Sequence, residues 1–368
     1  MPLKFKKILI DDQRCESAGI IDVNQDGQLD IVSGSYWYEG PDFVKRHLVA
    51  PQEPHNVEYF DDFSTIAMDV NGNGRPDVIT GGWFGSKLRW LENSGDTETQ
   101  WPVHELDHIG NIETTRAWDL DGDGIPEIIP NTPNDPLRVY KLITDASGKG
   151  TGEFEVHLLR ETRQEHGLGC GDIAGNGRMD IVLREGWLEA PADTWEAEWI
   201  WHPGLPVEDR ASVPILVVDV TGNGINDLVV GNAHGYGLDW IEHKIEGGEH
   251  RWIKHPIDPF NSQYHDMKWI DIDGDGAPEL VTGKRYRAHS GRDPGAHDDY
   301  GIYYFKWTGE NFVKQVIDYG PKRETTGLGI YFDMADFTGN GLPDIVAPGK
   351  DGLYLFLNEG SEIEGFKY

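Results

Sequence analysis

Short hydrophobic segments follow polar turns of one design seven times along this chain. Each turn reads Asp-h-x-x-x-Gly-x-x-[Asp/Glu]-h-h, where h is hydrophobic, and most copies have a second Gly two places before the first. The copies begin 47 to 65 residues apart, at Asp22, Asp69, Asp119, Asp172, Asp219, Asp271 and Asp336. Between the turns lie β-branched and aromatic runs such as YWYEG and LRWLEN, which favour strands. A repeat of this length with several short strands per copy is typical of a β-propeller.

A second repeat, an aromatic residue followed by a short apolar strand, comes after six of the seven turns. These segments are residues 43–49, 101–106, 154–159, 199–202, 252–257 and 312–317. The seventh turn has none after it, but residues 5–10 have the same character. We therefore predict an all-β fold, a seven-bladed propeller of four-stranded blades whose last blade is closed by residues 5–10. Residues 1–368 would then form a single domain.

The net charge of −32 argues against nucleic acid or an anionic membrane as a partner, because phosphate groups are bound by basic surfaces. Residues 1–20 hold no long apolar run, which predicts neither a signal peptide nor a transmembrane segment. Cys15 and Cys170 are too far apart in sequence to indicate a disulfide framework. We therefore expect a cytoplasmic protein, and the sequence leaves its oligomeric state unknown.

The acidic turns resemble the first half of a calcium loop, in which positions 1, 3, 5 and 9 supply oxygen ligands. Because calcium prefers several carboxylates, the third and sixth turns are the best candidates and the first turn is next. Their candidate ligands are Asp119, Asp121, Asp123 and Glu127; Asp271, Asp273, Asp275 and Glu279; and Asp22, Asn24, Asp26 and Asp30. The second turn is a weaker candidate. In the other three turns, the first Asp is expected to bind backbone N–H groups of its own turn.

The seven turns resemble the FG-GAP or VCBS-type repeats of integrin-like propellers, and the resemblance covers the whole chain. It implies a fold and leaves the function open.

Residues six places before the first Asp of each turn are equivalent by rotation, so they should converge where the central channel opens. They are Glu16, Phe63, Glu113, His166, Val213, His265 and Ile330. Imidazole and carboxylate groups bind Zn, Mn or Fe, so we predict a catalytic metal on His166, His265 and Glu113. The same groups could instead perform acid–base catalysis. A structural alternative pairs Glu16 and Glu113 with the nearby Arg14 and Arg116.

The loops after the second strands combine aromatic and charged residues, as a sugar site requires. Candidate substrate-binding residues are Trp37, Trp83, Arg184, Trp187, Lys284, Arg285 and Tyr286. The longest insertion, residues 284–301, is either a lid over the channel or an exposed loop. The three Trp residues also suit a packing role.

A narrower resemblance is to the propeller domain of aldos-2-ulose dehydratases, carried by HDMKWIDIDGDGAPEL from His265 and by RWLENSGDTETQWPVHEL at residues 89–106. It implies metal-assisted elimination of water from a keto-sugar, although the cupin domains of that family are missing from this sequence. His234, Tyr264 or His108 would serve as the base. His289 or His297 would serve as the acid.

Three functions are consistent with these patterns. The first is a metal-dependent carbon–oxygen lyase or dehydratase that acts on a carbohydrate or keto-sugar. The second is a non-catalytic propeller that binds a glycan or a protein. The third is a hydrolase or epimerase at the same site. The two His and two Glu residues at rotationally equivalent positions favour an enzyme, because a scaffold has no need of them.

Overall fold

The computed structural model describes residues 2–52, 54–56 and 58–361. These residues form thirty strands and one short 3₁₀ helix, η1 (Ala288–Gly291), so the expected all-β class is confirmed. Among the described residues there are five four-stranded sheets, one eight-stranded sheet and one two-stranded hairpin.

Each four-stranded sheet is antiparallel, and its strands are neighbours in sequence except where β1 joins the last sheet. The first contains β2 (Gly19–Ile21), β3 (Asp30–Ser33), β4 (Tyr36–Tyr38) and β5 (Arg46–Leu48). The next contains β8 (Ile66–Met68), β9 (Asp77–Gly81), β10 (Lys87–Leu91) and β11 (Val103–His108). The third contains β12 (Thr114–Trp118), β13 (Glu127–Asn131), β14 (Pro136–Thr144) and β15 (Gly150–Arg163). The fourth contains β24 (Tyr264–Ile270), β25 (Glu279–Lys284), β26 (Tyr300–Trp307) and β27 (Phe312–Gly320). The last contains β28 (Asp333–Ala335), β29 (Asp344–Gly349), β30 (Gly352–Ser361) and β1 (Leu3–Asp11).

The eight-stranded sheet consists of two four-stranded halves joined by a short parallel pairing of β16 with β20. One half contains β16 (Leu168–Gly171), β17 (Asp180–Leu183), β18 (Gly186–Glu189) and β19 (Ile200–Pro203). The other contains β20 (Ile215–Val218), β21 (Asp227–Gly231), β22 (Leu238–Glu246) and β23 (Glu249–Pro256). The hairpin consists of β6 (Pro54–Asn56) and β7 (Tyr59–Phe60).

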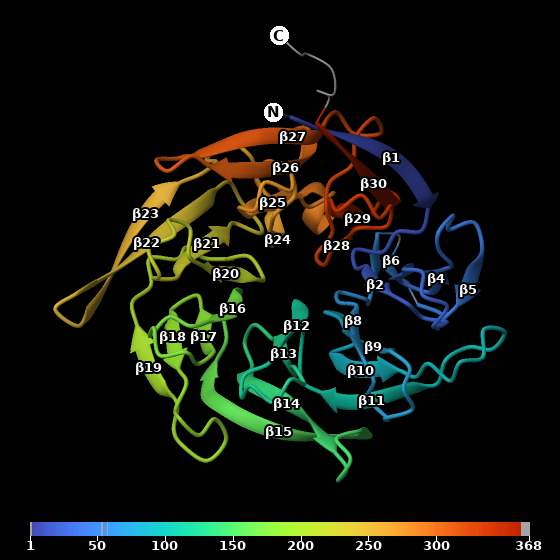
Figure 1. Ribbon diagram of the computed structural model, residues 1–368, viewed down its shortest axis with the longest axis horizontal. Helices are drawn as coiled ribbons and strands as arrows, with labels where there is room; N and C mark the ends of the chain where they lie inside the picture. The colour runs from blue at the N-terminus through green and yellow to red at the C-terminus, as the bar shows by residue number, and fades with distance from the viewer. Residues whose placement is uncertain (1, 53, 57, 362–368) are drawn as a thin grey trace.

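The sheets are arranged in a ring (Figure 1). Strands β12, β16, β20 and β24 lie toward its centre, and β11, β15, β19, β23 and β27 lie at its periphery. The N-terminal strand β1 pairs with the C-terminal strand β30, so the two ends of the chain complete one sheet as the sequence predicted. This arrangement brings the starts of the innermost strands together, although they are far apart in sequence.

The acidic turns are held by hydrogen bonds that their own carboxylates accept. In the first turn, Asp22 accepts backbone N–H groups of Asp26 and Gly27, each at 3.1 Å, and Gly27 has a φ of 86° that favours glycine. The ninth residue, Asp30, accepts the N–H of Val23 at 2.8 Å and that of Gly40 at 2.8 Å. The repeated spacing within the turn therefore follows from backbone hydrogen bonding.

A repeated group of Trp, Glu and His builds the outer part of two four-stranded sheets and of both halves of the eight-stranded sheet. In each group a Trp ring of the third strand stacks on a His ring of the fourth strand, with ring centroids 4.1 to 4.5 Å apart. The Glu two residues after the Trp lies 2.8 to 3.1 Å from Nε2 of the same His. The groups are Trp37–Glu39–His47, Trp90–Glu92–His104, Trp187–Glu189–His202 and Trp240–Glu242–His255. Trp37 and Trp187 are therefore buried packing residues, which disagrees with the substrate-binding role expected for them.

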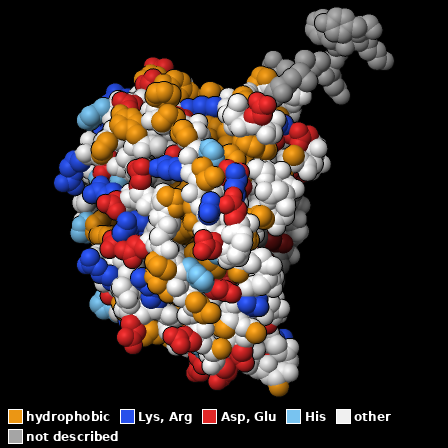
Figure 2. Space-filling view, turned by 90° about the vertical axis from the view of Figure 1, so that its left-hand side faces the viewer, with side chains coloured by type: hydrophobic (Ala, Val, Ile, Leu, Met, Phe, Trp, Pro, Cys, Tyr) orange, Lys and Arg blue, Asp and Glu red, His pale blue; other side chains and the backbone are white. Residues whose placement is uncertain are grey.

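The side of the ring shows acidic, basic and hydrophobic side chains mixed together (Figure 2). No helix in the described part of the chain is long and apolar enough to cross a membrane.

Candidate functional site

Four side chains from three sheets meet near the centre of the ring: Glu113, His166, His234 and His265. Glu113 directly precedes β12, and His166 lies two residues before β16. His265 is the second residue of β24, and His234 lies in the loop after β21. Each offers one ligand atom, and these four atoms lie within 4.8 Å of one another. We call this group the channel-mouth cluster.

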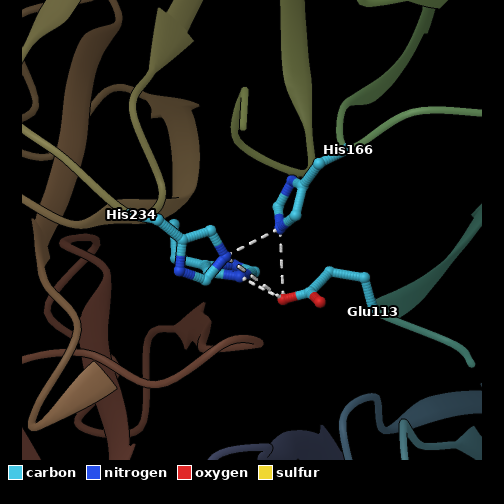
Figure 3. Close-up of side chains that lie close together, drawn as sticks. Glu113, His166 and His234 are labelled. Carbon is cyan, nitrogen blue, oxygen red and sulfur yellow. Dashed lines mark hydrogen bonds and ion pairs between the residues drawn. The ribbon is translucent and has the colours of Figure 1, made fainter. Parts of the chain in front are cut away.

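Glu113 is at the centre of the channel-mouth cluster (Figure 3). Its Oε1 lies 2.8 Å from Nε2 of His265, 3.2 Å from Nε2 of His166 and 4.0 Å from Nε2 of His234. The Nε2 atoms of His166 and His234 are themselves only 3.1 Å apart. Three imidazole nitrogens and one carboxylate oxygen thus face a common point.

The other ring nitrogens of two of these histidines are already engaged. Nδ1 of His166 lies 2.5 Å from the carbonyl oxygen of Ala211, and Nδ1 of His234 lies 3.0 Å from Oδ2 of Asp293. Both partners only accept, so each Nδ1 carries the proton and each Nε2 presents a lone pair when the ring is neutral. Two lone pairs at 3.1 Å repel each other unless a proton or a metal ion lies between them. This observation fits a cation-binding centre.

Burial lowers the pKa of His234 to about 4 and that of His265 to about 3, so both rings are neutral at physiological pH. Burial alone would raise the pKa of Glu113, but the His166 and His265 partners outweigh it and hold that pKa well below its usual value. A carboxylate and neutral imidazoles are the forms that bind a divalent transition metal.

Asp293 links the channel-mouth cluster to the insertion at residues 284–301. Its two oxygens accept from Nδ1 of His234 at 3.0 Å and Nδ1 of His289 at 2.8 Å. The rings of His234 and His289 are stacked with centroids 4.4 Å apart. An arrangement of carboxylate, histidine and metal is the usual way to fix a ligand's ring and tautomer. Asp293 was missing from the sequence prediction.

A cavity of about 470 Å³ opens over the cluster, a size that suits a small-molecule ligand. One part of its lining is aromatic, with Tyr59, Phe63, Trp83 and Phe84. Another part is basic, with Arg210 and Arg292 exposed at the rim and Arg285 buried. His55, stacked on Phe84 at 3.8 Å, and His289 also line it. Of the predicted substrate-binding residues, Trp83 and Arg285 therefore lie at this cavity.

The structural alternative in which Glu113 pairs with Arg116 is wrong for the described residues, and an arginine distant in sequence binds Glu16. Glu16 accepts from Arg285 at 2.8 and 3.1 Å, and Arg116 is 2.8 Å from Asp266. The buried guanidinium of Arg285 therefore links two of the rotationally equivalent positions, because its Nη1 also lies 3.9 Å from Glu113.

Several other predicted residues lie outside the channel-mouth cavity. The hydroxyl of Tyr264 is buried and donates to Asp258 at 2.7 Å, and burial raises its pKa well above the usual value, so it is unsuited to act as a base. His108 is exposed at the end of β11. Arg184 pairs with Asp209 at 2.9 Å. Lys284 is buried and binds the carbonyl of Asp298 at 2.9 Å, which braces the insertion.

Tyr286 and His297 lie at two neighbouring cavities instead. His289, predicted as an acid, lies at the channel-mouth cavity and remains a candidate for that role. The insertion at residues 284–301 thus contributes to the site, as one of the two sequence-based interpretations expected.

The two turns ranked first for calcium each contain a lysine. Nζ of Lys141 lies 2.6 Å from Asp121, 2.6 Å from Asp123 and 3.2 Å from Glu127. Nζ of Lys306 contacts Asp273, lies 2.8 Å from Asp275 and lies 3.2 Å from Glu279. Calcium in either turn would have to displace an ammonium group. The structure therefore lowers the rank of these two turns, and calcium binding by the first turn stays a prediction.

Residues 69–129 match the FG-GAP-like repeat family. Integrin alpha pat-2 of Caenorhabditis elegans is 23% identical over 239 residues, which are 52% of this chain and 19% of that protein. This chain therefore spans only a small part of the integrin's length. The crystal structure of Saccharomyces cerevisiae Sqt1 aligns with 98% of this chain and 99% of that chain, at a TM-score of 0.50 and 10% identity, which is a likeness of fold alone. Together these comparisons support a β-propeller fold in which residues 69–129 are similar to an FG-GAP-like repeat.

Proposed function

We propose that this propeller is a metal-dependent carbon–oxygen lyase, or dehydratase, that acts on a carbohydrate or keto-sugar in the channel-mouth cavity. One observation carries the proposal: Nε2 of His166 and Nε2 of His234 face each other at 3.1 Å beside Glu113, with both Nδ1 protons held elsewhere. A divalent ion such as Mn, Zn or Fe satisfies all four groups, with His265 as the fourth ligand.

The residues around the cluster suit an elimination. Glu113, His166, His234 and His265 would hold a divalent ion, whose Lewis acidity would favour removal of a proton next to a carbonyl group. His289 and His55 line the cavity without belonging to the cluster, so each is free to accept or donate a proton. Asp293 holds Nδ1 of His289 and thereby fixes the orientation of that ring. The aromatic wall offers faces on which the apolar side of a sugar ring stacks.

The resemblance of the segment that begins at His265 to aldos-2-ulose dehydratases supports elimination over hydrolysis or epimerisation. We also keep the proposals of a seven-bladed ring formed by residues 1–368 and of a cytoplasmic location. The seven-blade count is supported by the parallel junction of β16 with β20, because it divides the eight-stranded sheet into two halves of four strands.

The test is elemental analysis of the purified protein, comparing the wild type with a His166→Ala/His265→Ala double variant. We expect near-stoichiometric Mn, Zn or Fe in the wild type and loss of it in the variant. A Glu242→Gln variant, which alters a Glu–His pair in the outer strands at 3.1 Å, is the matched control and should keep the metal. A metal-loaded wild type would then be screened for elimination on keto-sugars and uronides. Absence of a transition metal from the wild type, even after incubation with each ion, would refute the metal-dependent mechanism.

The second candidate is a non-catalytic propeller that binds a glycan or a protein. The FG-GAP-like repeat and the similarity to an integrin alpha chain favour it. The two candidates separate in the same experiment: a protein that binds the metal and a sugar but converts no substrate supports the binding function.

A further inference from the structure

A second cavity, of about 400 Å³, lies beside the channel-mouth cavity and is lined largely by basic residues. Five of its nine lining residues are Lys or Arg: Arg14, Arg287, Lys322, Arg323 and Lys350. The chain as a whole has the opposite balance, with 64 acidic and 32 basic residues. Such a concentration of positive charge on an acidic protein calls for a ligand-based explanation. We call it the basic cavity.

The acidic residues in the lining are fewer than the basic ones. Three acidic residues line the basic cavity, and one of them, Glu58, is already bound by Arg287. A second, Asp351, accepts from Thr326 at 3.1 Å, and burial raises its pKa to about 7. The remaining acid, Asp12, is exposed. The cavity therefore keeps a net positive charge at neutral pH.

Lys350 is a buried residue of the basic cavity, and its position is fixed by its contacts. Its side chain is only 2% exposed, and its ammonium group donates to the carbonyl of Arg287 at 2.9 Å. The same group lies 3.5 Å from Glu16 and 3.9 Å from the centre of the Tyr59 ring. Burying an ammonium group is costly, so its fixed position between these partners indicates a defined role for its charge.

Lys322 and Arg323 line the same cavity from the loop between β27 and β28. Both are exposed, and their side chains have no partner among the described residues. Arg323 has a φ of 80°, which is uncommon for a residue with a side chain. Arg287, which also lines the basic cavity, has a φ of 51°. Backbone strain of this kind collects where a side chain must be held for binding.

We propose that the basic cavity binds an oxyanion, such as a phosphate, sulfate or carboxylate group, through Lys322 and Arg323. Guanidinium and ammonium groups form strong charge-assisted hydrogen bonds with such oxygens. The oxyanion is either a free inorganic ion or a charged substituent of a sugar. This site uses none of the four residues of the channel-mouth cluster, so it stands independently of the proposed lyase function.

Isothermal titration calorimetry on the full chain tests the proposal, with inorganic phosphate, inorganic sulfate, glucuronate and glucose 6-phosphate as probes and glucose as the neutral control. All titrations use one ionic strength, because salt screens such contacts. We expect the wild type to bind at least one anion and a Lys322→Ala/Arg323→Ala variant to bind it at least about tenfold more weakly. A Lys244→Ala/Arg251→Ala variant makes the same change in charge on the β22–β23 hairpin and should bind like the wild type.

The outcomes separate the sources of the oxyanion. Tighter binding of glucose 6-phosphate or glucuronate than of the inorganic ions assigns the site to a charged sugar, whereas equal binding assigns it to a free anion. Failure of all four anions to bind the wild type, or equal weakening in both double variants, would overturn the proposal. The metal content of the Lys322→Ala/Arg323→Ala variant should equal that of the wild type, so failure here leaves the proposed lyase untouched.

Discussion

The third and sixth acidic turns and the channel-mouth cluster differ in what surrounds their carboxylates: each of these two turns holds a lysine, and the cluster holds three imidazoles. In the third turn, two Asp residues and one Glu surround the ammonium group of Lys141 at 2.6 to 3.2 Å. At the channel mouth, Glu113 is surrounded by three imidazoles, and the guanidinium of Arg285 is 3.9 Å away.

Under the proposed function, the difference separates a structural site from one that binds an exchangeable ion. A lysine is a cation that cannot leave, so it neutralises the turn permanently and links it to the third strand of the sheet. Neutral imidazoles add lone pairs instead of charge, and lone pairs that face one another at 3.1 Å repel unless a proton or an added cation lies between them. The third and sixth turns thus contain their own cation, whereas under the proposed function an ion would complete the channel-mouth cluster.

A comparison of the repeats shows that the lysine occupies a position on the third strand that holds a Glu in four other repeats. Turns that end in Asp reach the backbone of the third strand with that carboxylate, as Asp77 does to the N–H of Asn93 at 2.7 Å. The two turns that end in Glu use its oxygen to bind Lys141 or Lys306. At the same place in two other four-stranded sheets and in both halves of the eight-stranded sheet, the chain has Glu, which pairs with a His. Charge on the third strand thus changes together with the ninth residue of the turn.

Of the variants that test this comparison, Asp293→Asn is expected to have the largest effect, a loss of metal affinity at the channel-mouth cluster. An Asn amide can donate to Nδ1 of His234, which would move the proton to Nε2 and remove the lone pair that faces the metal. We expect metal affinity to fall by about 10- to 100-fold, the usual effect of losing such a carboxylate partner. Competition with a metal-binding dye measures it.

A suitable control is Glu189→Gln, which changes a carboxylate bound to His202 at 2.9 Å in the outer strands. Its metal affinity should match that of the wild type. Equal affinity in Asp293→Asn and the wild type would mean that Asp293 has no influence on the cluster and that His234 is not a ligand.

The next largest effect is expected when the lysine is removed from an acidic turn, because the turn then resembles a cation site that has no ion of its own. A Lys141→Met/Lys306→Met variant leaves each set of carboxylates without its cation. Because the lysine side chains are 22% and 28% exposed, we expect a modest loss of about 1–2 kcal/mol per turn, and a melting temperature several degrees lower. Millimolar calcium should restore part of that stability in the variant and leave the wild type unchanged, as differential scanning fluorimetry would report.

Lys254→Met is the matched control, since Lys254 pairs with Glu208 and Asp239 outside the acidic turns. Calcium should not rescue it. A wild type whose melting temperature rises with calcium as much as that of the double variant would show that the lysines do not exclude the ion.

Much of the fold could be predicted because the same turn-and-strand pattern occurs seven times in the sequence. The pairing of residues 5–10 with the C-terminal strand followed from one missing copy of the outer strand. The convergence of Glu113, His166 and His265 followed from rotational equivalence, since residues at one register of a ring share one position. His234 was recognised only as a candidate base, because it comes from a different register.

The rest depended on packing that a single repeat does not reveal. Asp293 lies in an insertion with no counterpart in other repeats, so nothing in the periodicity marked it. Trp37 and Trp187 have the composition of a sugar platform, but the stacked His47 and His202 bury them. The lysines were visible in the sequence: aligning Lys141 and Lys306 with the Glu residues of other third strands would have indicated that these turns hold an internal cation.

The smallest effect concerns alkaline pH and tests the charge on the lysines directly. Burial alone would lower the pKa of Lys141 and Lys306, but hydrogen bonds to the turn carboxylates outweigh it and raise both values. A lysine whose folded pKa is raised stabilises the protein fully below its unfolded pKa of about 10.4, and this contribution is lost as pH rises toward the folded value. The melting temperature of the wild type should therefore exceed that of Lys141→Met/Lys306→Met by a constant margin from pH 7 to 9. The margin should shrink by about 1–3 °C at pH 11.5. Other lysines and tyrosines titrate in both proteins, so their effects cancel in the difference between the two melting temperatures. An unchanged margin at pH 11.5 would mean that hydrophobic packing of the lysine side chains, and not their charge, stabilises the turns.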